Sequence, residues 1–249
     1  MKLNGKVALI TGGGTGIGEA TAKLFAAEGA LVAITGRRKD VLEKVAKVIV
    51  ANGGKALAIA GSVTDDAQVQ STVDQTVRTF GKIDILVNNA AIGDFGLLLH
   101  ETTDQTWSGI LDTNLTGVFR VTRAVLPHML GRGGAIVNVS SVAGMIGIPK
   151  SAAYSATKGA LLALTRCLAI DYAKEKIRCN CVCPALVDTP MAADAIADPA
   201  MNAAMAAQHP IGRFGTPADV ARLLLYLVSE DASWVTGSIF TIDGGLTAQ

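Results

Sequence analysis

Short runs of apolar and β-branched residues alternate along this chain with longer amphipathic stretches. The apolar runs are nearly continuous, which is typical of strands that are buried on both faces of a parallel sheet. Segments with helical patterning fill the gaps, so the order of elements favours helices on both faces of one sheet. The sequence therefore predicts an α/β fold with a doubly wound parallel sheet of about seven strands flanked by helices. The predicted strands are 7–11, 31–35, 56–60, 83–88, 135–140, 177–183 and 238–243.

Composition and charge exclude several classes of protein. With 249 residues, half of them apolar and 17% charged, the chain is long enough for one large core, and we expect a single domain over residues 1–249. The apolar runs fall far short of the ~20 residues of a membrane span, and "VALI" is too short for the core of a signal peptide. A net charge of +1 without charge runs argues against nucleic acid. We expect a cytoplasmic protein with no membrane or nucleic-acid partner and a small-molecule substrate.

Three cysteines stand at alternate positions of the predicted strand 177–183. Cys179, Cys181 and Cys183 would share one face of that strand. Neighbours two apart lie roughly 6.6 Å apart at Cα with parallel side chains, at the edge of disulfide reach. A metal would need a fourth ligand, which the surrounding sequence does not offer. We expect small buried residues in a reducing compartment and no metal site.

The stretch "TGGGTGIG" (11–18) follows the first predicted strand and opens a helix over 17–29. Gly12 permits a tight turn, Gly16 lets the backbone approach a pyrophosphate, and Gly18 allows close packing of the helix on the sheet. The helix N-terminus offers unpaired N–H donors to the phosphates. This context predicts a dinucleotide site of the Rossmann type.

Two arginines follow the second predicted strand, in "ITGRRKD". An acidic residue at this place would hold the ribose 2′-hydroxyl of NAD, whereas arginine suits the 2′-phosphate of NADP. Arg37 and Arg38 therefore favour NADP(H) over NAD(H). The alternative is that one or both are solvated surface charges.

An Ala- and Met-rich stretch, 191–210, lies between the sixth predicted strand and a helix over 216–229. Binding elements in such folds concentrate on the loops after strand ends. We expect a mobile substrate lid around 188–213, with a surface helical hairpin as the alternative.

Five motifs stand in order along the chain: "TGGGTGIG", "NNA" (88–90), "NLTG" from Asn114, "VSS" (139–141) and "YSATK" (154–158), with "DGG" (243–245) near the end. In this set the chain resembles the short-chain dehydrogenases/reductases over essentially its whole length. The resemblance implies a single NAD(P)-binding Rossmann-fold domain. It also implies hydride transfer between NAD(P) and an alcohol or carbonyl.

The resemblance assigns site residues one by one. The implied catalytic set is Asn114, Ser141, Tyr154 and Lys158. The implied cofactor-binding residues are Gly12, Thr15, Gly16, Ile17, Gly18, Arg37, Arg38, Ser62, Val63, Asn88, Ala90, Tyr154, Lys158, Pro184, Val187 and Thr189. Beside these assignments, the candidate substrate contacts are Ser141, Met145, Tyr154, Leu186 and Met191.

Three residues depart from the family pattern. The usual "NNAG" ends in Ala91, Ser62 replaces an aspartate that touches the adenine, and Ala185 follows Pro184 where glycine is usual. These departures bear on cofactor affinity rather than on chemistry.

Tyr154 and Lys158 are one helical turn apart and share a face. Proton exchange with a substrate oxygen near neutral pH requires the pKa of the tyrosine to fall from about 10 to about 7. Such a shift corresponds to a stabilisation of the phenolate by roughly 4 kcal/mol. An ammonium within reach acts in that direction, so we expect Lys158 to lower the pKa of Tyr154.

The apolar segments 93–96 and 144–149 favour a secondary alcohol or ketone that is hydrophobic or alicyclic. One alternative is a 3-oxoacyl-[acyl-carrier-protein] reductase, for which Arg132 fits a basic patch while Glu175, between two lysines, does not. The other is a non-catalytic NADP-sensing regulator, which the complete catalytic set argues against.

The helix over 159–173 is apolar around most of its surface, so we expect a homotetramer formed through it and the helix before it.

Overall fold

A seven-stranded, all-parallel sheet forms the centre of the computed structural model, which describes residues 1–93, 95–197 and 199–249. The strand order is β3-β2-β1-β4-β5-β6-β7. All seven predicted strands are confirmed within two residues at each end, and so is the doubly wound Rossmann-type fold. The strands are β1 Val7–Thr11, β2 Leu31–Gly36, β3 Lys55–Ala60, β4 Ile85–Asn88, β5 Gly134–Val139, β6 Ile177–Pro184 and β7 Ile239–Ile242.

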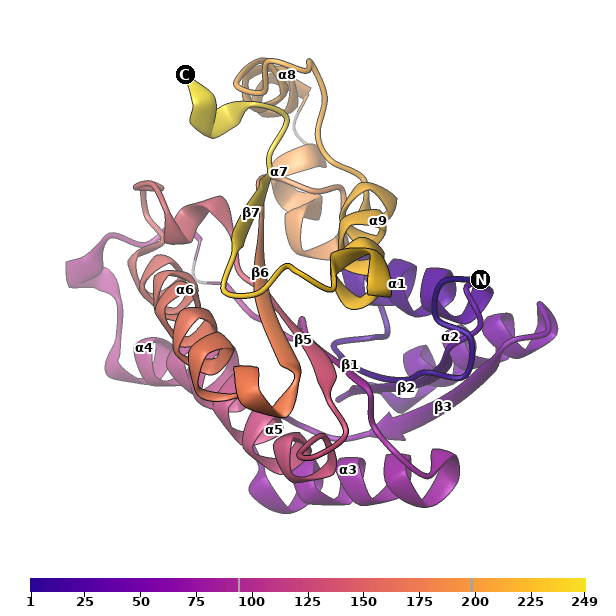
Figure 1. The fold of residues 1–249 in the computed structure, drawn as a ribbon. Helices are drawn as coiled ribbons and strands as arrows, with labels where there is room; N and C mark the ends of the chain where they lie inside the picture. The colour runs from indigo at the N-terminus through magenta and orange to yellow at the C-terminus, as the bar shows by residue number, and fades with distance from the viewer. Residues whose placement is uncertain (94, 198) are drawn as a thin grey trace.

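Helices cover both faces of this sheet (Figure 1). One face packs against α1 Gly16–Ala27, α2 Lys39–Ala51 and α9 Pro217–Val228. The other packs against α3 Asp66–Phe80, α5 Gly117–Val125 and α6 Ala152–Asp171, with α4 Asp104–Leu111 beside α6. The central strands are therefore buried on both sides, which explains their nearly continuous apolar sequence.

Strand order reverses between β1 and β4, which are neighbours although β2 and β3 intervene in the chain. Ligands of open parallel sheets bind at such a switch point, beyond the carboxyl ends of the strands. The loops after β1 and β4 lie at this edge. Two short helices, α7 Ala193–Ala197 and α8 Pro199–Ala207, lie beyond the carboxyl ends of β6 and β7 (Figure 1).

A π-helical turn over Asp112–Thr116 separates α4 from α5. Turns of this kind are rare and occur mostly at functional sites. Asn114, which the family resemblance assigns to the catalytic set, lies in this turn, and the wide turn itself was not predicted from the sequence.

The prediction that the three cysteines are small buried residues on one strand is confirmed. Cys179, Cys181 and Cys183 are fully buried on β6, and all are free thiols in the described chain. Within the described residues no group of three His, Cys, Asp or Glu is placed to hold a metal. The described helices are also too short or too polar to cross a bilayer.

Candidate active site

The glycine loop makes a close junction between β1 and α1. Gly16 has a φ of +55°, and a Cβ there would lie 3.0 Å from Thr189 Cγ2. A Cβ on Gly18 would lie 2.2 Å from the Gly12 carbonyl oxygen, a separation that no side chain tolerates. Both positions therefore require glycine, the first for its backbone and the second for close approach.

The first turn of α1 fits an anionic group. Its N-cap residue, Thr15, makes no side-chain capping hydrogen bond with the described residues. An uncapped helix N-terminus presents N–H donors and a partial positive charge. Ile17 and Gly18 lie in this turn, so the loop fits the pyrophosphate of a dinucleotide.

Asn89 holds this loop in place, and the sequence analysis missed it. Its Nδ2 donates to the Thr11 carbonyl at 2.9 Å and to the Gly12 carbonyl at 3.2 Å. The backbone N–H groups of Asn89 and Ala90 both donate to Thr11 Oγ1. The side-chain alternation of an extended strand end was the available signal, because it sends two adjacent asparagines to opposite faces.

Asn88, the asparagine assigned to the cofactor, lies on the other face. Its Nδ2 donates to Thr122 Oγ1 at 3.0 Å and to Asn138 Oδ1 at 2.9 Å. Its Oδ1 is buried without a described partner. The side chain is thus part of a polar cluster between the sheet and the α5–α6 layer.

Arg37 and Arg38 lie exposed between β2 and α2, and neither side chain forms an ion pair with the described residues. The Gly13 N–H donates to the Thr35 carbonyl at 3.2 Å, so the end of β2 lies beside the glycine loop. Two unpaired guanidinium groups near this edge are available to an anionic substituent.

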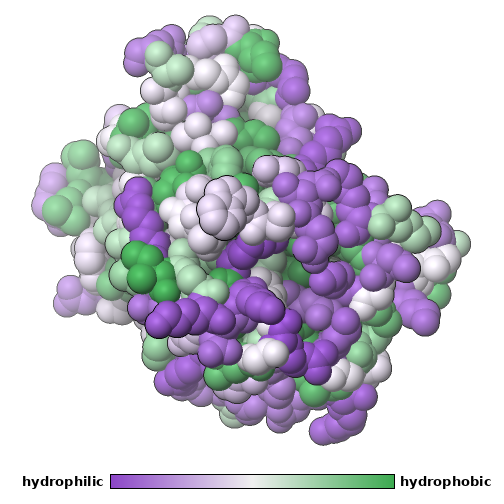
Figure 2. Space-filling view, viewed as in Figure 1, coloured by the Kyte–Doolittle hydropathy of each residue, from purple (hydrophilic) through white to green (hydrophobic). Residues whose placement is uncertain are grey.

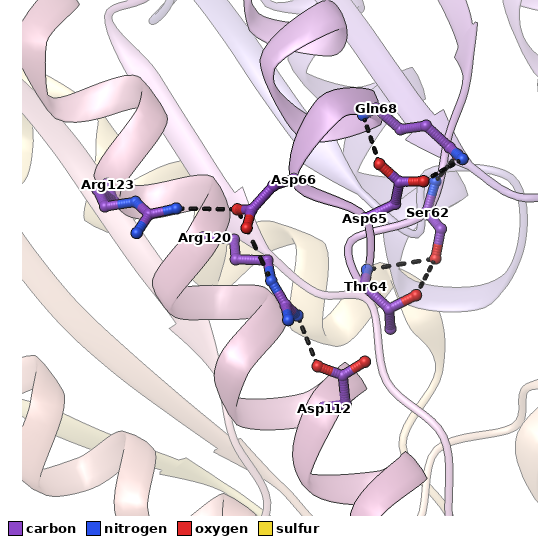
Figure 3. A network of polar contacts seen from close by, with 8 residues as sticks. All are labelled: Ser62, Thr64, Asp65, Asp66, Gln68, Asp112, Arg120 and Arg123. Carbon is purple, nitrogen blue, oxygen red and sulfur yellow. Dashed lines mark hydrogen bonds and ion pairs between the residues drawn. The ribbon is translucent and has the colours of Figure 1, made fainter.

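Ser62 and Val63, the residues assigned to the adenine, form the turn between β3 and α3 (Figure 3). The Ser62 hydroxyl lies 2.8 Å from Thr64 Oγ1, and the Ser62 N–H donates to Gln68 Oε1 at 2.8 Å. Val63 packs on Gly117, because a Cβ added to Gly117 would lie 2.7 Å from Cγ2 of Val63. The turn is therefore held by a hydrogen bond within it, by a hydrogen bond to α3 and by contact with Gly117 of α5.

Ser141, Tyr154 and Lys158 lie together where β5 ends and α6 begins. Tyr154 and Lys158 are buried, and the Lys158 Nζ lies 5.4 Å from the centre of the Tyr154 ring. Lys158 Nζ donates to the Val139 carbonyl at 2.8 Å. The neighbouring Ser140 is committed elsewhere, because its hydroxyl donates to the Lys158 carbonyl at 2.7 Å. This favours Ser141 over Ser140 as the serine that is available to a substrate.

Burial moves the two titrating groups of this cluster in opposite directions. Burial raises the pKa of Tyr154 to about 12, and a hydrogen bond with Ser141 acts against it. Burial also lowers the pKa of Lys158 to about 8, although the nearby Cys181 and Cys183 act in the opposite direction. The prediction that the pKa of Tyr154 lies below its ordinary value is therefore wrong. The reason is that burial disfavours the phenolate more than the neighbouring groups favour it.

Asn114 clamps the chain that follows β4. Its Oδ1 accepts from the Ile92 N–H at 2.9 Å, and its Nδ2 donates to the Ile92 carbonyl at 2.8 Å. The same Nδ2 lies 3.3 Å from Oγ1 of Thr157, the residue before Lys158. The π-helical turn thus brings Asn114 to the tyrosine–lysine pair.

The remaining predicted residues surround this cluster at the same edge. Ser141 Oγ lies 3.4 Å from the carbonyl of Pro184, at the end of β6. Val187 forms an isolated bridge with Gly215, and Thr189 packs on Gly16. Met145 and Met191 are exposed, whereas Leu186 is half-buried.

Phe95 was not among the predicted site residues, although the segment 93–96 was. Its ring lies 5.1 Å from the Tyr154 ring, tilted by 59°, and more than half of the residue is exposed. Asp94 in this segment and Asp198 in the predicted lid lie outside the described residues.

The fold and this edge define a nucleotide-dependent oxidoreductase, and comparisons with known proteins agree. A family model described as enoyl-(acyl carrier protein) reductase matches residues 12–247. The chain is 41% identical over 247 residues to the 3-oxoacyl-[acyl-carrier-protein] reductase FabG of Thermotoga maritima, covering 99% of each. It is 42% identical over 244 residues to the cis-4-hydroxycyclohexanecarboxylate dehydrogenase of Sinomonas cyclohexanicum, covering 98% of this chain and 97% of the relative.

A crystal structure of a short-chain type dehydrogenase/reductase from Mycobacterium marinum superposes with a TM-score of 0.95 at 38% identity, covering 100% of this chain and 98% of the other. The chain belongs to the short-chain dehydrogenase/reductase family. It is an NAD(P)-dependent dehydrogenase/reductase acting on CH–OH groups.

The pKa of Lys158 generates a prediction about stability. Because it lies below its unfolded value of 10.5, the folded chain binds fewer protons than the unfolded chain between about pH 8 and about pH 10. Stability conferred through this group therefore rises with pH in that window. As the pH rises through this window, we expect the free energy of unfolding of the wild type to increase by about 2 kcal/mol relative to that of Lys158→Met. Urea unfolding of both at several pH values measures this gain, and parallel pH curves would contradict it.

Proposed function

We propose that this protein interconverts a secondary alcohol and a ketone, acts on a hydrophobic or alicyclic substrate, and prefers NADP(H). The observation that carries the proposal is the cluster of half-buried Ser141 with buried Tyr154 and Lys158, which lies beside the apolar ring of Phe95 at the carboxyl end of the sheet, where the glycine loop also lies.

The proposed chemistry places the substrate oxygen between the hydroxyls of Ser141 and Tyr154. Bound NAD(P) supplies or accepts the hydride. Ser141 donates a hydrogen bond that fixes the oxygen, and Tyr154 donates the proton. Its pKa of about 12 keeps the phenol protonated at neutral pH, which is the form that can donate a proton to a carbonyl oxygen.

Lys158 is proposed to orient the cofactor ribose and to tune Tyr154. Its pKa of about 8 leaves the ammonium mostly protonated at neutral pH. Asn114 is proposed to support a proton path toward Lys158, because its amide approaches Thr157 next to that lysine.

Apolar side chains support the proposed substrate class. Phe95, Met145 and Met191 are exposed around the carboxyl edge, and Leu186 is half-buried beside them. Figure 2 shows hydrophobic residues at the left margin, over the segment between β4 and α4. This segment contains Leu97, Leu98 and Leu99, all of which are exposed. An aromatic platform over Tyr154 suits a flat or alicyclic carbonyl compound.

Reduction of 3-oxoacyl groups on acyl carrier protein is the second candidate, favoured by the relative from Thermotoga maritima. A basic patch that could bind the acyl carrier protein near the site is poorly supported within one chain. Arg132 precedes β5 and therefore lies at the amino end of the strands, whereas Ser141 lies at their carboxyl end. Glu175 accepts from the Gly131 N–H at 2.9 Å, so a carboxylate lies in the same region.

The lid over 188–213 is proposed from its anchoring. Its two ends meet where the Asp188 N–H donates to the Gly215 carbonyl and the Gly215 N–H donates to the Leu186 carbonyl. The helices α7 and α8 lie between these anchors. Protection from proteolysis within 188–213 on adding NADPH and a substrate tests the lid; unchanged cleavage would count against it.

A homotetramer is proposed from the outer face of α6, where Ala156, Ala163, Cys167 and Ile170 are exposed. Phe119 of α5 is exposed as well. Light scattering tests this, and a monomeric mass would refute it.

We also place the protein in the cytoplasm, because its buried cysteines are free thiols. Cell fractionation tests that assignment.

A substrate panel with Tyr154→Phe tests the reaction. We expect the wild type to reduce cyclic ketones with NADPH at a higher kcat/KM than an acetoacetyl thioester. Tyr154→Phe should lower kcat by about 1000-fold, because the proton donor is lost, while NADPH affinity stays within about twofold. Initial rates and fluorescence titration measure both. Retained turnover would refute the role of Tyr154, and a preference for the thioester would favour the second candidate.

Cofactor preference is tested by Arg37→Asp. We expect NADPH binding to weaken by at least about tenfold, because an arginine–phosphate contact is replaced by repulsion, with NADH binding much less affected. Arg38→Asp is the matched control and should show a smaller discrimination. Equal losses for the two cofactors in Arg37→Asp would contradict the NADP(H) preference.

A further inference from the structure

Four charged side chains form a network between α3, the π-helical turn and α5 (Figure 3). Arg120 Nη1 lies 2.6 Å from Asp112 Oδ1, and Arg120 Nε lies 3.7 Å from Asp66 Oδ1. Arg123 Nη2 lies 2.9 Å from the same Asp66 oxygen. Arg120 is therefore the member that bridges two carboxylates.

The two arginines differ in burial and in what they connect. The side chain of Arg120 is 18% exposed, whereas that of Arg123 is 57% exposed and packs on the Phe119 ring. A planar guanidinium can hold two carboxylates at once, and partial burial protects such a pair from screening by water. An exposed pair such as Arg123–Asp66 contributes little. The Arg120–Asp112 hydrogen bond is therefore the shortest and most buried contact of the network, and the ion pair of Arg120 with Asp66 at 3.7 Å extends it to α3.

The bridge joins two segments that belong to different parts of the site. Asp66 is the first residue of α3 and directly follows the turn that begins at Ser62, the turn assigned to the cofactor base. Asp112 is the first residue of the π-helical turn that carries Asn114. Val63 packs on Gly117 just beyond that turn, so the same two segments also meet through apolar contact.

The position of the π-helical turn decides where the Asn114 amide lies. A π turn widens the backbone and does not follow from the helix on either side, so it needs outside contacts to hold its geometry. At its inner side Asn114 clamps the backbone of Ile92 with two hydrogen bonds. At its outer side Asp112 is held by Arg120.

We propose that Arg120 is a positioning residue, which fixes the π-helical turn against the 62–66 segment and thereby sets the Asn114–Ile92 clamp. The inference rests on the proposed function in one respect, since it requires Asn114 to take part in the reaction. Within the described residues the polar partners of Arg120 are Asp112 and Asp66 and not the proposed catalytic residues, so Arg120 acts through Asp112 and the turn.

The test compares Arg120→Gln with Arg123→Gln, which alters the same helix and the same partner, Asp66, but not Asp112. We expect Arg120→Gln to lower kcat about tenfold, within the range by which such networks modulate a distant site. Exchange of the Ile92 amide hydrogen should become about tenfold faster, because its acceptor is displaced. Arg123→Gln should change both by less than about twofold.

Asp112→Asn provides a second variant if Arg120→Gln folds poorly. It changes one atom, and it should reproduce both effects; the double variant should be no worse than either single one, because both remove the same bridge. Light scattering of each variant checks that assembly is unchanged. Unchanged Ile92 exchange or unchanged kcat in Arg120→Gln and Asp112→Asn would overturn the proposal.

The two failures are distinguishable. If the wild type reduces no carbonyl substrate, the proposed function fails, and Ile92 exchange still tests whether Arg120 holds the clamp. If the wild type is active and Arg120→Gln behaves as Arg123→Gln does, the positioning role fails alone.

Discussion

The closeness with which α1 approaches β1 is the constraint on which the site depends. The missing side chain at Gly18 lets the helix start against the Gly12 carbonyl, and Asn89 reaches from the neighbouring strand to hold the same loop. Thr11 Oγ1 accepts two N–H groups from the loop after β4, so the two loops at the switch point hold each other. Each hydrogen bond contributes only about 1 kcal/mol. Together they fix the direction in which the helix N-terminus faces, and hence where an anion can bind.

Burial, rather than mutual attraction, dominates the titration of Tyr154 and Lys158. Both groups are moved toward their neutral forms, the phenol upward in pKa and the ammonium downward. At neutral pH the phenol is therefore protonated, because burial outweighs the hydrogen bond with Ser141 that favours the phenolate. The ammonium of Lys158, with a pKa of about 8, is also mostly protonated.

The fold could be predicted from sequence because burial on two faces leaves a mark on every strand, and β1 was predicted residue for residue. The glycine loop was also predictable, since its geometry excludes other residues. The contacts of Asn89 and Phe95 were not, because they depend on which loops meet at the switch point and on how a loop folds over α6. The prediction of a lowered pKa for Tyr154 was wrong for a related reason. Spacing along a helix shows that two side chains share a face, but it does not show how much water reaches them.

The contacts between the end of β5 and the start of α6 hold Lys158 in place. The Lys158 ammonium donates to the Val139 carbonyl, and the Ser140 hydroxyl donates to the Lys158 carbonyl. A Cβ on Gly144 would lie 2.6 Å from the Lys158 carbonyl carbon, so the turn after β5 and the start of α6 interlock. Phe95, which packs on the Tyr154 ring, comes from the loop after β4, and that loop is tied to the chain before α6 by the Gly96 N–H, which donates to the Lys150 carbonyl. A substitution at an exposed position such as Phe95 can change the apolar surface beside Tyr154 without removing the hydrogen bond that holds the Lys158 ammonium.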